Sequence, residues 1–171
     1  DISCSGDGNH LVAGSNEGRI YSYSRDGTEQ WQQNLGNINC LALSLDSSKI
    51  AIGTFSGILY LLSKSGRREW ETKVNGSINS ISISRDGNNI CIGTDRGMIF
   101  NFDETGKELW KYKIIGASDG GICHSSDGKY IVAGSWDTIF LFGVDGKVVW
   151  NTRLNKKIIS TYVANDAILI A

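Results

Sequence analysis

Short stretches rich in apolar residues, each ended by a turn that contains glycine, follow one another along the whole chain. In the clearest series, Ile81 to Ser84 alternate apolar and polar side chains, the period-two pattern of a strand with one buried face. Further strands are expected at residues 90–92, 98–102 and 109–114, separated by an Asp-Gly turn, a short loop and a Glu-Thr-Gly turn. Because no part of this series has helical spacing, the pattern predicts a four-stranded antiparallel meander.

This unit occurs four times. Successive tryptophans of the repeat are 39, 40 and 40 residues apart, and a glycine lies four positions before each one. A second glycine and an aspartate keep the same period. The markers are Trp31, Trp70, Trp110 and Trp150; Gly27, Gly66, Gly106 and Gly146; Gly14, Gly53, Gly93 and Gly134; and Asp7, Asp46, Asp86 and Asp127. Such a period is typical of repeat architectures.

The third strand of each unit indicates what the unit packs against. Its copies span residues 20–23, 59–62, 99–102 and 139–142, with large residues, mostly aromatic, at the second and fourth places and apolar or mixed residues at the others. Since alternate residues of a strand share a face, the sheet must be covered on both sides. A four-stranded sheet that packs between copies of itself is a propeller blade. We therefore predict an all-β β-propeller; a β-sandwich would not require the same motif four times.

The segment Asp103 to Trp110 resembles the tryptophan-docking motif of the PQQ-type β-propeller repeats, and residues 25–31, 64–70 and 144–150 are looser copies. The resemblance implies that the four repeat tryptophans pack against neighbouring blades. The first half of each unit is also similar to WD40-like repeats, but the Asp, His, Ser/Thr and Trp tetrad of true WD40 blades is missing. Trp136-Asp137 has the wrong phase for a WD dipeptide.

The repeats divide the chain into blades at about residues 1–36, 37–76, 77–116 and 117–156, with a partial blade at 157–171. In the partial blade, Ile159 to Ala164 matches a first strand, Asp166 the turn aspartate and Ile168 to Ala171 a second strand. Members of the resembled family usually close a ring of seven or eight blades. We expect this segment to belong to a longer ring, with a further tryptophan near position 188; the alternative is a four-bladed ring that exchanges its half blade with a partner.

The composition argues against two kinds of partner, nucleic acid and the membrane interior. The 17 Lys and Arg residues balance 18 Asp and Glu residues, for a net charge of −1, which argues against a nucleic-acid binder that relies on bulk charge. No apolar run approaches the length of a membrane-spanning helix, so membrane insertion of this segment is not expected. Proline is absent, so the turns depend on Gly, Asp, Asn and Ser.

Cysteine and histidine offer few signs of a reactive site. Cys4, Cys40, Cys91 and Cys123 replace small or apolar residues at different places in the blade and contain no C-x-x-C pair. We interpret them as buried free thiols, with a disulfide or metal ligation as alternatives. His124 is interpreted as a structural histidine on an innermost strand, the alternative being a ligand or general base. His10, at a varied position near a turn, is expected to be exposed.

Other catalytic and metal motifs are absent from the sequence. The repeated Asp-Gly pairs lack the D-x-D-x-D-G spacing of calcium loops and are interpreted as hairpin turns. There is no G-x-S-x-G elbow, Walker-type phosphate loop or H-E-x-x-H helix. We assign no catalytic, cofactor-binding or metal-binding residue.

Loop residues vary among the repeats, as expected for a binding surface. The loops between second and third strands and those between blades should open on one face. Phe55 and Trp136 are large aromatic residues where a turn accepts polar ones; the alternative is that they fold back onto their blades. The predicted contact residues are Glu17, Phe55, Arg96, Trp136, Asp137 and Lys156.

The sequence therefore favours a non-catalytic scaffold or sensor domain that binds another protein, or another domain of its own chain, through this face. The family resemblance also implies an alternative, a quinoprotein dehydrogenase that uses PQQ and calcium and whose site lies in further blades. Such enzymes often carry a disulfide between adjacent cysteines, and no adjacent cysteines occur here.

Overall fold

A computed structural model describes residues 1–116, 118, 121–158, 160–163 and 168–170. These residues form four sheets of four strands, a two-stranded sheet and no helix. The first sheet contains β1 (Ile2–Cys4), β2 (His10–Gly14), β3 (Arg19–Ser24) and β4 (Glu29–Asn34). The second contains β5 (Ile38–Leu43), β6 (Lys49–Thr54), β7 (Ile58–Ser63) and β8 (Arg68–Lys73).

The later sheets follow the same plan. The third contains β9 (Ile78–Ile83), β10 (Asn89–Thr94), β11 (Met98–Asp103) and β12 (Glu108–Lys113). The fourth contains β13 (Ile122–His124), β14 (Tyr130–Ser135), β15 (Thr138–Gly143) and β16 (Val148–Arg153). The last pair is β17 (Thr161–Val163) and β18 (Ile168–Ile170), which matches the two strands expected in the partial blade; Asp166 lies outside the described residues.

Within each four-stranded sheet, the strands pair in sequence order and antiparallel, which confirms the predicted meander. The pairing of third and fourth strands shifts register one residue before each repeat tryptophan, in all four sheets. Thus Leu61 faces Trp70, whereas the next residue of that strand, Leu62, faces Arg68. A bulge increases the local twist of a strand, so the shift re-aims the strand at the position of the indole.

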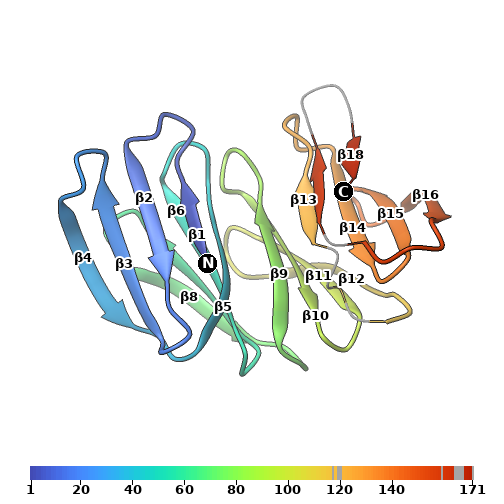
Figure 1. The fold of residues 1–171 in the computed structure, drawn as a ribbon, viewed down its shortest axis with the longest axis horizontal. Coiled ribbons are helices and arrows are strands. Elements are labelled where there is room, and N and C mark those ends of the chain that lie inside the picture. Colours follow the sequence, from blue (N-terminus) through green and yellow to red (C-terminus); the bar gives the residue numbers. More distant parts are fainter. Residues whose placement is uncertain (117, 119–120, 159, 164–167, 171) are drawn as a thin grey trace.

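The sheets stand side by side in an arc that does not close (Figure 1). Successive sheets enclose separate hydrophobic clusters, such as the one between the first and second sheets that joins Val12 and Ile20 to Ile50 and Leu62. Similar clusters fill the spaces between the second and third sheets and between the third and fourth. The four sheets are therefore consecutive propeller blades. No helix of the described residues is long and apolar enough to cross a membrane.

The third strands of the two middle blades are buried on both faces, as predicted. In β7, Leu59, Tyr60, Leu61 and Leu62 are all buried. The aromatic residues two places apart stack along one face of the other third strands, with ring centroids 6.2 Å apart for Phe100 and Phe102. Burial on both faces is what distinguishes a blade from a sheet with one solvated side.

The Asp-Gly turns have the hairpin role expected of them. In the third blade, the Ser84 hydroxyl donates to Asp86 Oδ1 at 2.6 Å, and the same oxygen accepts the backbone N–H of Asn88 at 3.2 Å. The equivalent Ser–Asp bond occurs in the other three blades. Gly87 has a φ of 75°, which glycine adopts without steric cost; the second blade has Ser47 at this position with a φ of 65°.

The repeat tryptophans connect neighbouring blades. The indole Nε1 of Trp31 donates to the backbone carbonyl of Lys64 at 2.9 Å, and Trp110 makes the same bond to Val144 at 2.9 Å. The ring lies over the turn glycine of the next blade, since a Cβ added to Gly66 would come within 2.9 Å of the Trp31 ring. The docking expected from the family resemblance is thereby confirmed for the first three tryptophans. Trp150 is 37% exposed.

Candidate interaction face

Two sets of connections form one face of the molecule, which we call the loop face: the hairpin loops 15–18, 54–57, 94–97 and 135–138, and the interblade segments 35–37, 75–77 and 154–158. Backbone hydrogen bonds join the two sets. Phe55 N–H donates to the carbonyl of Asn37, Asp95 N–H donates to Ser77, and Ile158 N–H donates to Trp136. For the described residues, these bonds bear out the prediction that both sets open on one face; in the predicted interblade loop 116–119, residues 117 and 119 lie outside the described residues.

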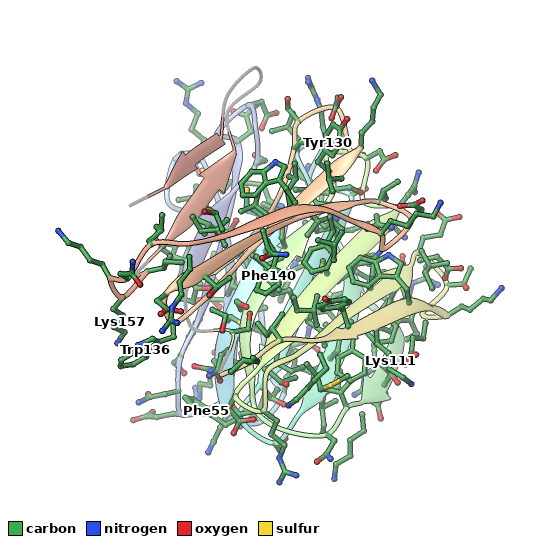
Figure 2. All side chains as sticks on the ribbon, turned by 90° about the vertical axis from the view of Figure 1, so that its right-hand side faces the viewer. Phe55, Lys111, Tyr130, Trp136, Phe140 and Lys157 are labelled. Atoms are coloured by element: carbon green, nitrogen blue, oxygen red, sulfur yellow. The ribbon has the colours of Figure 1, made fainter. Side chains whose placement is uncertain are left out.

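Phe55 and Trp136 do not fold back onto their blades. Phe55 is 51% exposed and Trp136 is 58% exposed. In Figure 2 both project toward the lower side of the molecule, whereas Tyr130, at the other end of its blade, lies toward the upper side. The two aromatic side chains therefore belong to the accessible part of the loop face.

Trp136 has an uncommon backbone conformation. Its φ is 35°, in the left-handed region where a bulky residue is rarely found. The fourth blade has one residue fewer between its second and third strands than the other blades, and Ser135 pairs directly with Thr138 across the turn. The shortened turn forces one of its two central residues to a positive φ, and here that residue is a tryptophan rather than a glycine.

Charged side chains surround the exposed indole. The ammonium of Lys157 lies 5.4 Å from the centroid of the Trp136 ring, within the range of a cation–π interaction, and Figure 2 shows the two side chains adjacent. Asp137 accepts a hydrogen bond from Arg153 Nε at 2.5 Å, and its pKa is lowered chiefly by this bond. This ion pair holds the carboxylate of Asp137 beside the Trp136 turn.

A surface groove of about 530 Å³ begins at this turn. Its walls include Ile115, Trp136, Phe140 and Arg153. Ile115 is 95% exposed, an unusual environment for a large aliphatic residue. The groove therefore combines apolar walls with a charged edge, which is the composition of the centre of a protein interface.

The other predicted contact residues are spread over separate blades. Glu17, Arg96 and Lys156 are exposed on the hairpin and interblade loops, as expected. Arg96 lies beside the interblade glycine Gly76, and its backbone carbonyl accepts a hydrogen bond from Lys113. Of the six predicted residues, the structure brings Trp136 and Asp137 together in one turn, while the other four lie on other loops.

Sequence reasoning missed Ile115, Arg153 and Lys157. The adjacent residues Ile114 and Ile115 could have indicated the exposure of Ile115, because neighbouring side chains on an extended segment point to opposite sides. In the structure Ile114 is 1% exposed, and Ile115 points outward. Arg153 and Lys157 carried no such signal. Their association with the Trp136 turn depends on the pairing of β15 with β16 and on the path of the following segment.

The histidine expectations had different outcomes. His124 is buried, with Nδ1 2.9 Å from the Ser82 hydroxyl and Nε2 2.9 Å from Asn89 Oδ1, which confirms a structural role. Burial lowers the pKa of His124 to about 4. The expectation for His10 was wrong: it is 3% exposed and bonds to Ser22 through Nε2 at 2.8 Å. His10 starts β2 and faces the second blade, so its side chain is covered although it follows a turn.

All four cysteines are free thiols. Cys40 and Cys91 are buried and Cys123 is half-buried, but Cys4 is exposed, which corrects the expectation that all four are buried. Cys4 lies on β1 of the first sheet, which packs against a neighbouring sheet on one side only in the described part of the chain. Among the described residues, no group of three His, Cys, Asp or Glu side chains is placed to hold a metal ion.

The chain matches a known family of repeat proteins. A family model of PQQ-type repeats, described as outer membrane protein assembly factor BamB, matches residues 16–113 and matches a second time at residues 95–171. A search of curated proteins finds no match. The two overlapping family matches together extend over nearly the whole chain.

Proposed function

The chain belongs to the PQQ-type repeat family described as outer membrane protein assembly factor BamB, and on this premise we propose that it is a non-catalytic scaffold that binds a protein through its loop face. The bound protein is either a separate chain or another domain of the same polypeptide. The family description names an assembly factor, which supports a protein partner over a small-molecule substrate.

The proposal rests chiefly on the exposure and the backbone conformation of Trp136. The side chain is 58% exposed while its backbone has a φ of 35°, so the residue costs stability in the isolated domain without filling a core. Such strain persists at positions that serve a function other than folding. An exposed tryptophan flanked by arginine and lysine is typical of the residues that dominate binding energy at protein interfaces.

Phe55 and Arg96 extend the proposed contact area to the second and third blades. Both are exposed on hairpin loops of the loop face. A partner that spans the loops of several blades would contact these two residues and Trp136 together, burying an area typical of specific complexes. Glu17, Asp137 and Lys156 would then lie at the polar rim, where charges guide orientation more than they add affinity.

The triple substitution of Phe55, Arg96 and Trp136 by alanine tests the proposal. Partners captured from extracts of the source cells by the wild-type protein should bind the triple variant at least about 30-fold more weakly, the effect of one hot spot of about 2 kcal/mol. The matched control replaces Arg25, Arg67 and Lys107, three exposed residues of the β3–β4, β7–β8 and β11–β12 turns, and should keep wild-type affinity. Binding that survives the triple change would contradict the proposal.

The non-catalytic part is tested separately. Titration of the protein with PQQ and Ca²⁺ should give no saturable absorbance change of a bound quinone. A stoichiometric signal would replace the scaffold proposal with a quinoprotein dehydrogenase.

A further inference from the structure

A groove of about 920 Å³ lies between the first and second blades, at the end opposite the loop face. Its residues come from the turns β1–β2, β5–β6 and β7–β8 and from the strands β2, β3, β4 and β7. The volume is within the range of small-molecule sites in proteins. The groove is therefore separate from the proposed protein-binding surface.

A buried histidine without a full set of partners lines this groove. His10 is 3% exposed, and its Nε2 lies 2.8 Å from the Ser22 hydroxyl. Its Nδ1 is buried and has no hydrogen-bond partner in the described part of the chain. This nitrogen is covered by protein atoms, so the imidazole forms part of the groove wall, where a ligand in the groove changes its magnetic environment.

The equivalent positions of the second blade carry different side chains, which interact with one another. Lys49, at the position of His10, forms an ion pair with Glu69, at the position of Gln30. Leu61, at the position of Ser22, is fully buried. The first blade thus carries neutral side chains where the second has an ion pair, and a small hydroxyl group where the second has a leucine.

The groove lining is polar and electrically balanced. Ser22, Ser24, Ser48, Ser63 and Ser65 contribute hydroxyl groups, and Asn9 and Gln30 contribute amides. One carboxylate, Asp46, and one ammonium, Lys64, also line it, so neither an anion nor a cation is favoured by net charge. Burial, and next the charge of Lys64, lower the pKa of His10, so the imidazole is neutral near pH 7.

Aromatic rings complete the lining. Trp31 and Tyr23 both border the groove, and each offers an apolar ring surface beside the hydroxyl and amide groups. Sugars need this combination, because their C–H faces pack on aromatic rings while their hydroxyl groups both donate and accept hydrogen bonds. A nucleotide or phosphate would gain no net attraction, because Asp46 offsets the charge of Lys64.

We propose that the groove between the first and second blades binds an uncharged carbohydrate of about disaccharide size, with its hydroxyl groups bonded to the serine and amide groups of the lining and its C–H face against Trp31 or Tyr23. The site goes beyond the protein-binding proposal and uses none of its residues. The chain contains only two histidines, and His124 already has partners at both ring nitrogens, so it serves as an internal reference.

The test titrates the ¹⁵N-labelled protein with maltose, cellobiose and N,N′-diacetylchitobiose while the imidazole nitrogens are observed by long-range ¹H–¹⁵N correlation. At least one disaccharide should shift the His10 Nδ1 resonance saturably, with a Kd between about 0.1 and 10 mM, and leave His124 unchanged. No movement of His10 at about 50 mM of any of the three sugars, or equal movement of both histidines, would overturn the proposal.

A transplant variant supplies the second measurement. The triple change H10K/S22L/Q30E gives the first blade the ion pair and the leucine of the second blade, which fold together there. Saturation transfer from protein to sugar should be lost in this variant and retained in Trp136→Ala. Transfer that persists in the transplant would overturn the sugar site, whereas the Trp136 variant reports on the protein-binding surface alone.

Discussion

The indole Nε1 of Trp70 donates a hydrogen bond to the backbone carbonyl of Glu104, 34 residues later in the next blade, at 2.8 Å. The same ring covers Gly106, so that a Cβ added there would lie 2.8 Å from a ring carbon. The Trp70 side chain thus holds the neighbouring turn in place and leaves no room for a side chain at Gly106. Repeated at each blade junction, this contact makes stability depend on neighbouring blades, as in other repeat proteins.

Two glycine substitutions separate the stability lost by displacing the Trp70 ring from the stability lost through a positive φ alone. Gly27 and Gly106 have φ values of 83° and 84°, but the added Cβ of Gly27 would meet nothing within 4 Å. Gly27→Ala should cost about 1–2 kcal/mol for the left-handed backbone alone. Gly106→Ala should cost about 1–3 kcal/mol more, because the methyl displaces the Trp70 ring. Equal losses in urea unfolding would contradict the docking role of the indole.

Ser47 occupies a turn position where three other blades have glycine. Its φ of 65° is costly for a residue with a Cβ. Ser47→Gly should raise the free energy of unfolding by about 0.5–1 kcal/mol, the strain relieved less the extra chain entropy of glycine. The reverse change, Gly128→Ser, places a Cβ in open space at the equivalent turn and should lower stability by a similar amount. Chemical denaturation measures both, and a loss of stability in Ser47→Gly would refute the argument.

His124 makes stability depend on pH between 6.5 and 4. Its pKa is about 4 in the folded protein and 6.5 in the unfolded chain, because burial disfavours the imidazolium. The neutral form is therefore favoured by folding: the full contribution is present above pH 6.5 and is lost as the pH falls to about 4. The loss should total about 3 kcal/mol.

His124→Gln should remove most of this dependence while leaving that of other groups. Below pH 4 a further loss follows from Asp7 and Asp127, whose pKa values are lowered to about 2, chiefly by bonds from Ser5 and Ser125. Carboxylates with lowered pKa values stabilise the fold when ionised, so their contribution disappears as the pH falls through 3.8 toward 2. Denaturation curves from pH 8 to pH 3 test both regions; an unchanged slope in His124→Gln would exclude His124 as its source.

The four thiols should differ in reactivity. Burial raises the pKa of Cys40 to about 12 and raises that of Cys91 as well, so neither forms the reactive thiolate in the folded protein. Cys4 is exposed and should be alkylated first by iodoacetamide at pH 8. Mass spectrometry of peptides after graded reaction times gives the order. Rapid labelling of Cys91 under native conditions would mean that the third blade opens readily.

The repeat pattern was sufficient to predict the fold. Trp31, Trp70, Trp110 and Trp150 gave the period, and the apolar residues on both faces of the third strands gave the packing between sheets. These features could be recognised because the same pattern of strands and turns occurs in all four blades. Errors occurred where one blade differs from the others: His10 was assigned to solvent because its equivalents vary, but in the structure it is buried beside Ser22.

The candidate surface was predictable only in part. The sequence placed Phe55 and Trp136 in hairpin loops but left open whether they fold back onto their blades, and the structure shows both exposed. The backbone of Trp136 was not predictable, because its φ results from a turn one residue shorter than in the other blades. The groove beside it depends on Ile115 and Arg153, which come from two different segments that only the folded sheet brings together.

The substitution Trp136→Gly tests the central claim most directly, since it separates stability from binding. Glycine adopts a φ of 35° without strain, so the melting temperature should rise by about 2 °C even though the contact with Lys157 is lost. The affinity for the protein partner captured by the wild type should fall at least about 30-fold in the same variant. A melting temperature that falls, together with unchanged affinity, would mean that Trp136 is a structural residue and that the loop face is not the binding surface.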